Sequence, residues 1–237
     1  MKRALLCCWL ALCLAMTFAG GLLSTACAAD DSGFVSLFDG KTLDGWAGKS
    51  QFWSVKDGAI TGQTTKENPT KGNTFLIWRG GKPADFELRL KFRMVGGNSG
   101  IQYRSSEFDN FVVGGYQADI DAGLHFIGIL YEERGRGILC PRAQKLVIGE
   151  DGKKTAAAEK TCDEKKLLAS IKIDQWNDYA IICQGNHLVQ KINGFTTVDV
   201  TDCEKGKSRA EGILALQLHA GPPMLVQFKD IQLKQLK

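Results

Sequence analysis

The chain has 237 residues, of which 30 are Lys or Arg and 26 are Asp or Glu, and its formal net charge is +4 at pH 7. So small an excess of positive charge argues against a nucleic-acid partner, because proteins that bind nucleic acids concentrate many basic residues on one face. A chain of this length can bury a complete hydrophobic core as a single domain.

The first 28 residues are typical of an export signal. A short basic start precedes an apolar run at residues 4–18, and Ala26-Cys27-Ala28 offers the small residues of a cleavage site. A lipoprotein signal, with Cys27 as the anchored residue, is the alternative. The apolar run is shorter than the roughly 20 residues that a membrane-spanning helix needs. We therefore expect an exported protein, periplasmic or extracellular, with one domain over residues 29–237 and no transmembrane span.

Short runs of alternating apolar and polar residues fill this predicted domain. The expected strands are residues 34–38, 53–56, 59–62, 74–78, 85–94, 98–104, 115–121, 126–131, 145–148, 176–184, 187–192, 195–200, 212–219 and 224–236. Two-residue turns at Asp57-Gly58, Gly185-Asn186 and Asn193-Gly194 predict hairpins. A phase change predicts a bulge near Asp230, and only residues 155–169 suit a short helix. The pattern predicts an all-β fold, a two-sheet antiparallel sandwich.

Four cysteines remain in the predicted domain, and they are Cys140, Cys162, Cys183 and Cys203. In an exported protein an even number permits two disulfides, with three connectivities. Cys140 and Cys162 bracket a charged insertion, which makes them a candidate pair, but the connectivity stays open. The absence of any C-x-x-C sequence gives little support to a zinc site.

Three of the expected strands combine an apolar face with an unusual polar face, because residues i and i+2 of a strand share one side. The polar faces carry Gln102 and Arg104, then Gln117, Asp119 and Asp121, then Gln217 and His219. In one sheet these residues would form a patch of acidic, basic and amide groups suited to a sugar, with Tyr103 as a stacking residue. The alternatives are a solvated sheet face with a surface ion pair and, for His219, a structural histidine.

The carboxylates leave several interpretations open. Asp119 and Asp121 would lie about 7 Å apart at Cα, which suits a glycosidase pair, a metal site or mutual pKa tuning. Glu132 and Glu133 add two more carboxylates, and the sequence does not decide which of them faces the patch.

Several motifs resemble one protein family. They are F-D-G-K-T-L-D-G-W at residues 38–46, D-F-E-L-R-L-K-F-R at 85–93, N-S-G-I-Q-Y-R at 98–104, G-Y-Q-A-D-I at 115–120 and L-Q-L-H-A-G-P-P-M at 216–224. In this order they are similar to the 3-keto-disaccharide hydrolase family. The resemblance implies a concanavalin A-like jelly-roll sandwich, secretion, and action on 3-keto-glycosides. The insertion after Leu139 departs from the family pattern.

A 3-keto group acidifies the hydrogen at C2, so a base can remove it and the glycosidic oxygen at C1 can leave. This route needs a base, a group that stabilises the enolate, and an acid. The strand faces suggest His219 or Asp119 as the base, Arg104 as the stabiliser, and Asp121 or Glu132 as the acid. The residues expected to contact the sugar are Gln102, Gln117, Gln217 and Tyr103.

No cofactor is firmly predicted, although a divalent metal could take part. The chain has no dinucleotide fingerprint, so a separate sugar 3-dehydrogenase is expected to supply the keto substrate. Two other functions compete with this reading: a non-catalytic carbohydrate-binding module, and an ordinary glycoside hydrolase on the same fold. Loss of turnover with retained sugar binding would favour the binding module.

Overall fold

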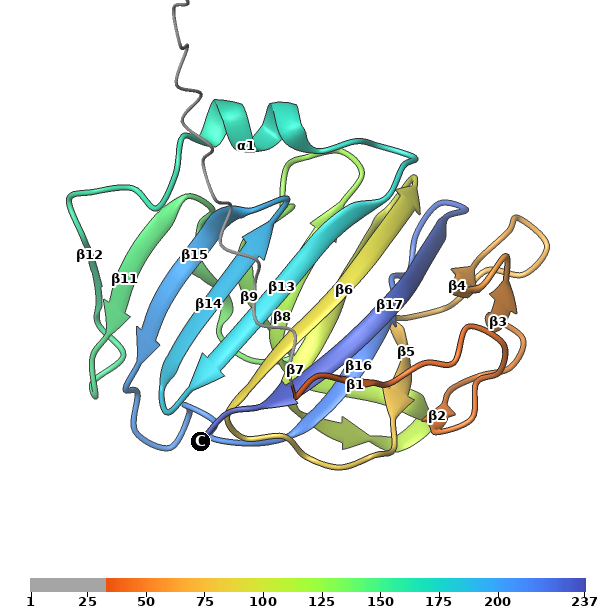
Figure 1. Ribbon diagram of the computed structural model, residues 1–237, viewed down its shortest axis with the longest axis horizontal. Helices are drawn as coiled ribbons and strands as arrows, with labels where there is room; N and C mark the ends of the chain where they lie inside the picture. Colours follow the sequence, from red (N-terminus) through yellow and green to blue (C-terminus); the bar gives the residue numbers. More distant parts are fainter. Residues whose placement is uncertain (1–32) are drawn as a thin grey trace, which may run out of the picture. The chain divides into compact units, whose positions relative to one another are not determined.

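A computed structural model describes residues 33–237, whose strands form two sheets that pack face to face (Figure 1). The expected export signal and Cys27 lie outside the described residues. Every strand pair is antiparallel except β11 with β15, which run parallel. The prediction of an all-β, two-sheet antiparallel sandwich is confirmed.

One sheet has ten strands. In spatial order they are β12 (Lys154–Ala156), β11 (Gln144–Ile148), β15 (Phe195–Asp202), β14 (His187–Ile192), β13 (Asn177–Gln184), β6 (Phe86–Val95), β17 (Leu225–Gln235), β4 (Ala59–Gln63) and β3 (Trp53–Lys56), with β1 (Val35–Ser36) beside β17.

The other sheet has seven strands and carries the candidate site. Its order is β10 (Gly137–Cys140), β9 (Leu130–Glu133), β8 (Val112–Asp121), β7 (Asn98–Phe108), β16 (Ile213–Leu218), β5 (Thr74–Trp78) and β2 (Trp46–Ala47). A short 3-10 turn, η1 (Asp109–Phe111), joins β7 to β8.

The core lies between the sheets and follows the alternation read from the sequence. In β6 the side chains of Phe86, Leu88, Leu90 and Phe92 are buried, while the residues between them are partly exposed. Tyr103 of β7 and its neighbours meet them from the seven-stranded sheet. Each large apolar side chain buried in this way contributes roughly 1.5–3 kcal/mol to folding.

The predicted turns and the predicted bulge are present. Asn193 and Gly194 both have positive φ, 48° and 83°, which is the backbone that joins two strands of matching twist in a tight hairpin. Asp57 and Gly58 do the same between β3 and β4. Asp230 has φ 52° where the register of β17 against β6 shifts, so the bulge lies where the phase change predicts it.

The segment after Leu139 differs from its prediction in the position of its helix and in its cysteines. Its helix is α1 (Glu164–Ser170), shorter and later than residues 155–169, because Asp163 caps it and residues before it pair with β11 as strand β12. The suggested disulfide between Cys140 and Cys162 is wrong, since all four cysteines of the described residues are free thiols. The Cys140 thiol is buried and directed at the carbonyl oxygens of Pro141 and Gln144.

Candidate functional site

The three polar strand faces lie side by side in the seven-stranded sheet. The register pairs Gln102 with Gln117 and Gly100 with Asp119 across β7 and β8. On the other side of β7, Ala215 of β16 pairs with Gln102. Alternate residues of these strands face the core between the sheets, so the polar residues point to the outer face of the sheet.

Three glutamines on this face bind one another. The Gln117 Oε1 atom accepts hydrogen bonds from Nε2 of Gln102 (2.5 Å) and Nε2 of Gln217 (2.9 Å). These two donors fix the amide orientation of Gln117, whose Nε2 therefore points at Asp119 Oδ2, 3.1 Å away. All three glutamines are buried. We expected them to bind sugar hydroxyls, but the geometry makes Gln102 and Gln217 supports for Gln117.

Gly100 provides the space for this arrangement. A Cβ atom at position 100 would lie 2.5 Å from Cγ of Gln117, well inside van der Waals contact. The missing side chain lets the amide of Gln117 lie across β7, where Gln217 can reach it. The glycine of the N-S-G-I-Q-Y-R motif is thus a packing requirement of the site.

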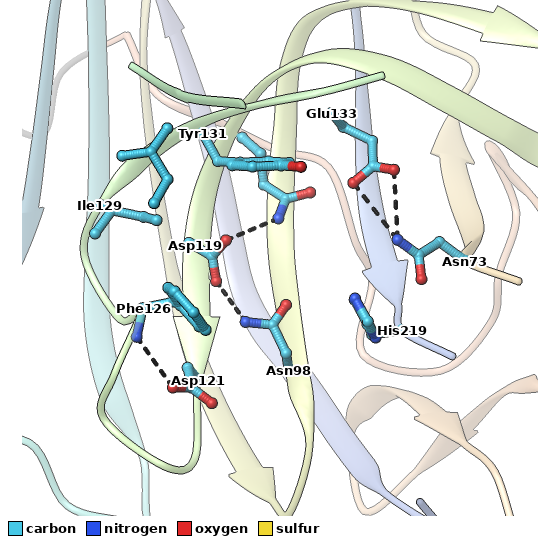
Figure 2. A pocket seen from close by; sticks show the side chains of 11 residues that line it. Asn73, Asn98, Asp119, Asp121, Phe126, Ile129, Tyr131, Glu133 and His219 are labelled. Carbon is cyan, nitrogen blue, oxygen red and sulfur yellow. Dashed lines mark hydrogen bonds between the residues drawn. The ribbon is translucent and has the colours of Figure 1, made fainter. Parts of the chain in front are cut away.

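Asp119 receives two hydrogen bonds at the centre of the site (Figure 2). Asn98 Nδ2 donates to Oδ1 at 2.7 Å, and Gln117 donates to Oδ2. Only 4% of the residue is exposed. Burial raises the pKa of Asp119 to about 7, against the opposing effect of the two hydrogen bonds. This carboxyl group can therefore exchange a proton near neutral pH.

A pocket of about 380 Å³ opens in front of Asp119. Its lining residues are Asn73, Asn98, Gln117, Asp119, Asp121, Phe126, Ile129, Tyr131, Glu133, Ile138 and His219 (Figure 2). The volume is within the range of small-molecule sites.

Glu133, Asn73 and His219 occupy the same side of the pocket (Figure 2). Burial raises the pKa of Glu133, which accepts weak hydrogen bonds from Asn73 Nδ2 and Gln217 Nε2 at 3.3–3.5 Å. The Nδ1 atom of His219 lies 2.5 Å from the carbonyl oxygen of Ala220. Because a carbonyl only accepts, Nδ1 carries a proton, and in the neutral tautomer that this fixes, Nε2 is the acceptor.

Asp121 has a different function from Asp119. Its two oxygens accept hydrogen bonds from the backbone N–H groups of Gly123 (3.1 Å), His125 (2.7 Å) and Phe126 (3.0 Å). These bonds fold the loop after β8 back onto the pocket. Asp121 lines the pocket, but both of its oxygens are engaged by the loop, so the structure makes it a support for the loop. Its expected role as the acid stays a prediction.

Arg104 lies outside the pocket. The register of β7 against β8 shifts between Tyr103 and Ser106, and Arg104 has φ 44°, so its side chain leaves the outer face. Its guanidinium, fully buried, donates to the carbonyl oxygens of Ala84 and Gly185 and to Asp85. The expected role of Arg104 as enolate stabiliser is wrong, because its donors tie β7 to the other sheet.

Tyr103 and Glu132 also lie away from the pocket. The Tyr103 hydroxyl accepts a hydrogen bond from Gln190 Nε2 at 3.0 Å within the core, so the ring cannot stack on a sugar. Glu132 is buried and binds Nε of Arg136 at 2.6 Å. The expectations that Tyr103 stacks on a sugar and that Glu132 acts as the acid are therefore incorrect.

Several lining residues were not singled out from the sequence: Asn73, Asn98, Phe126, Ile129, Tyr131 and Ile138. Tyr131 shares a face of β9 with Glu133, because residues two apart on a strand lie on the same side. The register places Tyr131 opposite Gln117, and this pairing puts both on the pocket side. No local pattern marks Asn73, which precedes β5 and lies far from β9 in sequence.

Within residues 33–237, no three His, Cys, Asp or Glu side chains come together as a set that could hold a metal ion. No helix in the same part is long and apolar enough to cross a membrane.

The fold and the pocket together define a class: antiparallel jelly-roll sandwiches with a ligand-sized pocket on the outer face of one sheet. Within this class, the chain belongs to the family of the 3-keto-alpha-glucoside-1,2-lyase-like domain, whose model matches residues 33–234. The family resemblance noted in the sequence motifs is thereby confirmed.

One curated relative, a 3-keto-disaccharide hydrolase of Bacteroides thetaiotaomicron, is 34% identical over 90 residues; the match covers 33% of this chain and 29% of that protein. Among solved structures, one from Parabacteroides distasonis has a TM-score of 0.57 at 18% identity, covering 86% of this chain and 99% of its own. The carbohydrate-binding module CBM66 of Bacillus subtilis has a TM-score of 0.52 at 14% identity, with 80% and 95% covered. At such identities these two likenesses show the fold alone.

Proposed function

We propose that the protein cleaves 3-keto-glycosides by elimination followed by hydration. The observation that carries the proposal is Asp119, a buried carboxyl group whose pKa is about 7 and which points into a pocket that also holds Glu133 and His219. A base whose pKa lies near the working pH combines a useful ionised fraction with a strong affinity for the proton.

The reaction balances with water as the only co-substrate. The base removes the C2 proton, and the electron pair of the C–H bond forms an enolate with its charge on the C3 oxygen. The enolate collapses, the C1–O bond breaks, and the leaving oxygen takes a proton. Water then adds to C1 of the resulting enone while C2 regains a proton. The products are a free 3-keto sugar and an alcohol.

The pocket supplies groups for each step. Asp119 acts as the base. Asn98 uses one amide hydrogen in its bond to Asp119, which leaves a second one to donate to the enolate oxygen. Glu133, whose pKa is raised by burial, retains a proton more readily than an exposed glutamate and protonates the leaving oxygen. His219 accepts a hydrogen bond from a sugar hydroxyl through Nε2.

Two expectations from the sequence accompany the proposal. The keto group must be formed by a separate sugar 3-dehydrogenase, and export would place the reaction in the periplasm or outside the cell. Growth on the unoxidised glycoside should then depend on both proteins.

The test is the release of products from a 3-keto-disaccharide and from its unoxidised parent, before and after chelation. We expect cleavage of the keto sugar alone, and a slower rate when C2 carries deuterium, because the C2–H bond breaks in the first step. Cleavage of both sugars without an isotope effect would indicate an ordinary glycoside hydrolase. Binding of both without cleavage would indicate a carbohydrate-binding module. Loss of activity on chelation would reveal a metal requirement.

A further inference from the structure

The pocket has one polar side and one largely apolar side (Figure 2). Asn73, Glu133 and His219 lie on the first, Phe126 and Ile129 lie on the second, and Asp119 lies between them. The Asp121 carboxylate lies beside Phe126, where it binds the backbone of the loop. The described residues include seven large apolar side chains with high exposure, and two of these, Phe126 at 49% and Ile138 at 44%, line this pocket. Exposed apolar groups that converge on a polar site indicate a ligand with an apolar part.

Phe126, Ile129 and Ile138 form the apolar wall of the pocket, to which the sheet and one loop both contribute. Ile138 of β10 pairs with Tyr131 of β9, and Tyr131 pairs with Gln117 of β8, so the three side chains form a row on the outer face. Phe126 is held at the end of the loop whose backbone binds Asp121.

The segment after Leu139, expected from the sequence to be an insertion, supports the same side of the pocket. Lys154, the first residue of β12, donates through Nζ to the carbonyl oxygen of Ile138 at 2.6 Å. The insertion thus fixes the strand that carries Ile138. A change in this segment between relatives would alter this side of the pocket and leave Asp119 unchanged.

We propose that the site prefers glycosides whose leaving group is an apolar alcohol over disaccharides. This inference rests on the proposed elimination, in which Asp119 acts at C2 and the leaving group extends from the neighbouring C1. The sugar ring finds hydrogen-bond partners on the polar side, so the leaving group contacts the apolar wall. A second sugar there would lose water from its hydroxyls against Phe126, Ile129 and Ile138 and would gain few partners in return.

The experiment compares three 3-keto-glucosides: methyl, cyclohexylmethyl and a disaccharide, each as both anomers. The alkyl leaving groups differ little in acidity, so their rates report contact with the wall. We expect kcat/KM to be about tenfold or more higher for the cyclohexylmethyl compound than for the other two.

Variants locate the preference. Phe126→Ala and Ile138→Ala should each reduce the preference for cyclohexylmethyl over methyl by about tenfold. Phe108→Ala and Val147→Ala are matched controls, because both residues are 46% exposed and neither lines the pocket. Equal rates for the three substrates, or a disaccharide preference unaffected by the variants, would overturn the inference and leave the elimination proposal intact.

A binding measurement separates the two proposals. If no 3-keto-glucoside is cleaved, the elimination proposal fails, and calorimetry with the unoxidised methyl and cyclohexylmethyl glucosides still tests the wall. Tighter binding of the cyclohexylmethyl compound, lost in Phe126→Ala, supports an apolar-aglycone site. Equal binding of both compounds overturns it.

Discussion

Asp119 is the residue on which the proposed chemistry depends, because burial makes its negative charge costly. Two amide donors offset part of the cost of burial, yet the pKa still rises to about 7. The amides do not titrate, so the proton affinity of Asp119 follows from burial and from the geometry of Asn98 and Gln117. Burial of Asp119 should therefore affect both the pH dependence of the rate and the pH dependence of stability.

The first prediction concerns rate against pH. The ionised carboxylate is the proposed base, so kcat/KM for a 3-keto-glycoside should fall as Asp119 is protonated below pH about 7. It should fall again at higher pH, where Glu133, the proposed acid, loses its proton. Asp119→Asn should lower kcat/KM by roughly 10²–10⁴-fold. Asp57→Asn, in the exposed β3–β4 turn, is the control. A wild-type profile that is flat from pH 5 to 9 would exclude Asp119 as the base.

The second prediction concerns stability. The folded-state pKa of Asp119 is raised above the usual value of 3.8, so its contribution to stability is full below about pH 4 and is lost as pH rises to about 7. Asp119→Asn does not titrate. The free energy of unfolding of the variant, relative to wild type, should therefore increase between pH 4 and 7 by about 1.4 kcal/mol per unit of pKa shift, and stay constant above pH 7. Urea unfolding across this range measures the difference; a constant difference would mean that burial does not perturb Asp119.

At the same scale, single residues explain why the sequence predicted only part of the site. Alternation placed Gln117, Asp119, Gln217 and His219 on one face, because a period of two is a local property of a strand. The sequence puts Arg104 on the wrong face because the bulged residues of β7, Arg104 and Ser105, include no glycine or proline that would mark a bulge. Its backbone conformation, costly for a non-glycine residue, is held by the carbonyl groups of other segments.

Among the strands and turns, some features are specified by neighbouring residues and others by pairing with distant segments. The hairpin turns of β13, β14 and β15 were predictable, since residue pairs such as Asn193-Gly194 specify their own backbone. Which of Glu132 and Glu133 faces the pocket was not, because a shift of one residue in register exchanges the faces of a strand. The register of β9 is set by its pairing with Gly115 and Tyr116 of β8, which no local pattern reveals.

The loop after β8 carries the third prediction. Asp121→Ala removes the acceptors of three backbone N–H groups and should lower the free energy of unfolding by about 1–3 kcal/mol. The amides of residues 123–126 should exchange faster with solvent, and Phe126 should lose its fixed place in the pocket wall. Asp121→Asn keeps one oxygen and should show a smaller effect. Unchanged hydrogen exchange in Asp121→Ala would contradict a supporting role for Asp121.

For the whole described domain, a charged cluster ties the two sheets together at a distance from the pocket. Arg136 follows β9 of the seven-stranded sheet and binds Glu132, Asp202 at the end of β15 of the ten-stranded sheet, and Glu204, at 2.6–2.8 Å. Asp202 also accepts a hydrogen bond from the buried Tyr116 hydroxyl. Burial alone would raise the pKa of Asp202, but the bonds from Arg136 and Tyr116 hold it below its usual value.

The last prediction follows from this cluster. Arg136→Met leaves two buried carboxylates without their cation and should lower the free energy of unfolding at pH 7 by about 3–5 kcal/mol. A carboxylate whose pKa is lowered on folding stabilises the fold at pH values above its unfolded pKa of about 3.9. This stabilisation is lost as the pH falls, so the wild type should lose it toward pH 3. The difference between Arg136→Met and wild type should shrink over that range. Arg79→Met breaks an exposed pair with Glu107 and should cost no more than about 1 kcal/mol. Urea unfolding at both pH values compares the variants, and a difference independent of pH would show that the carboxylates do not depend on Arg136.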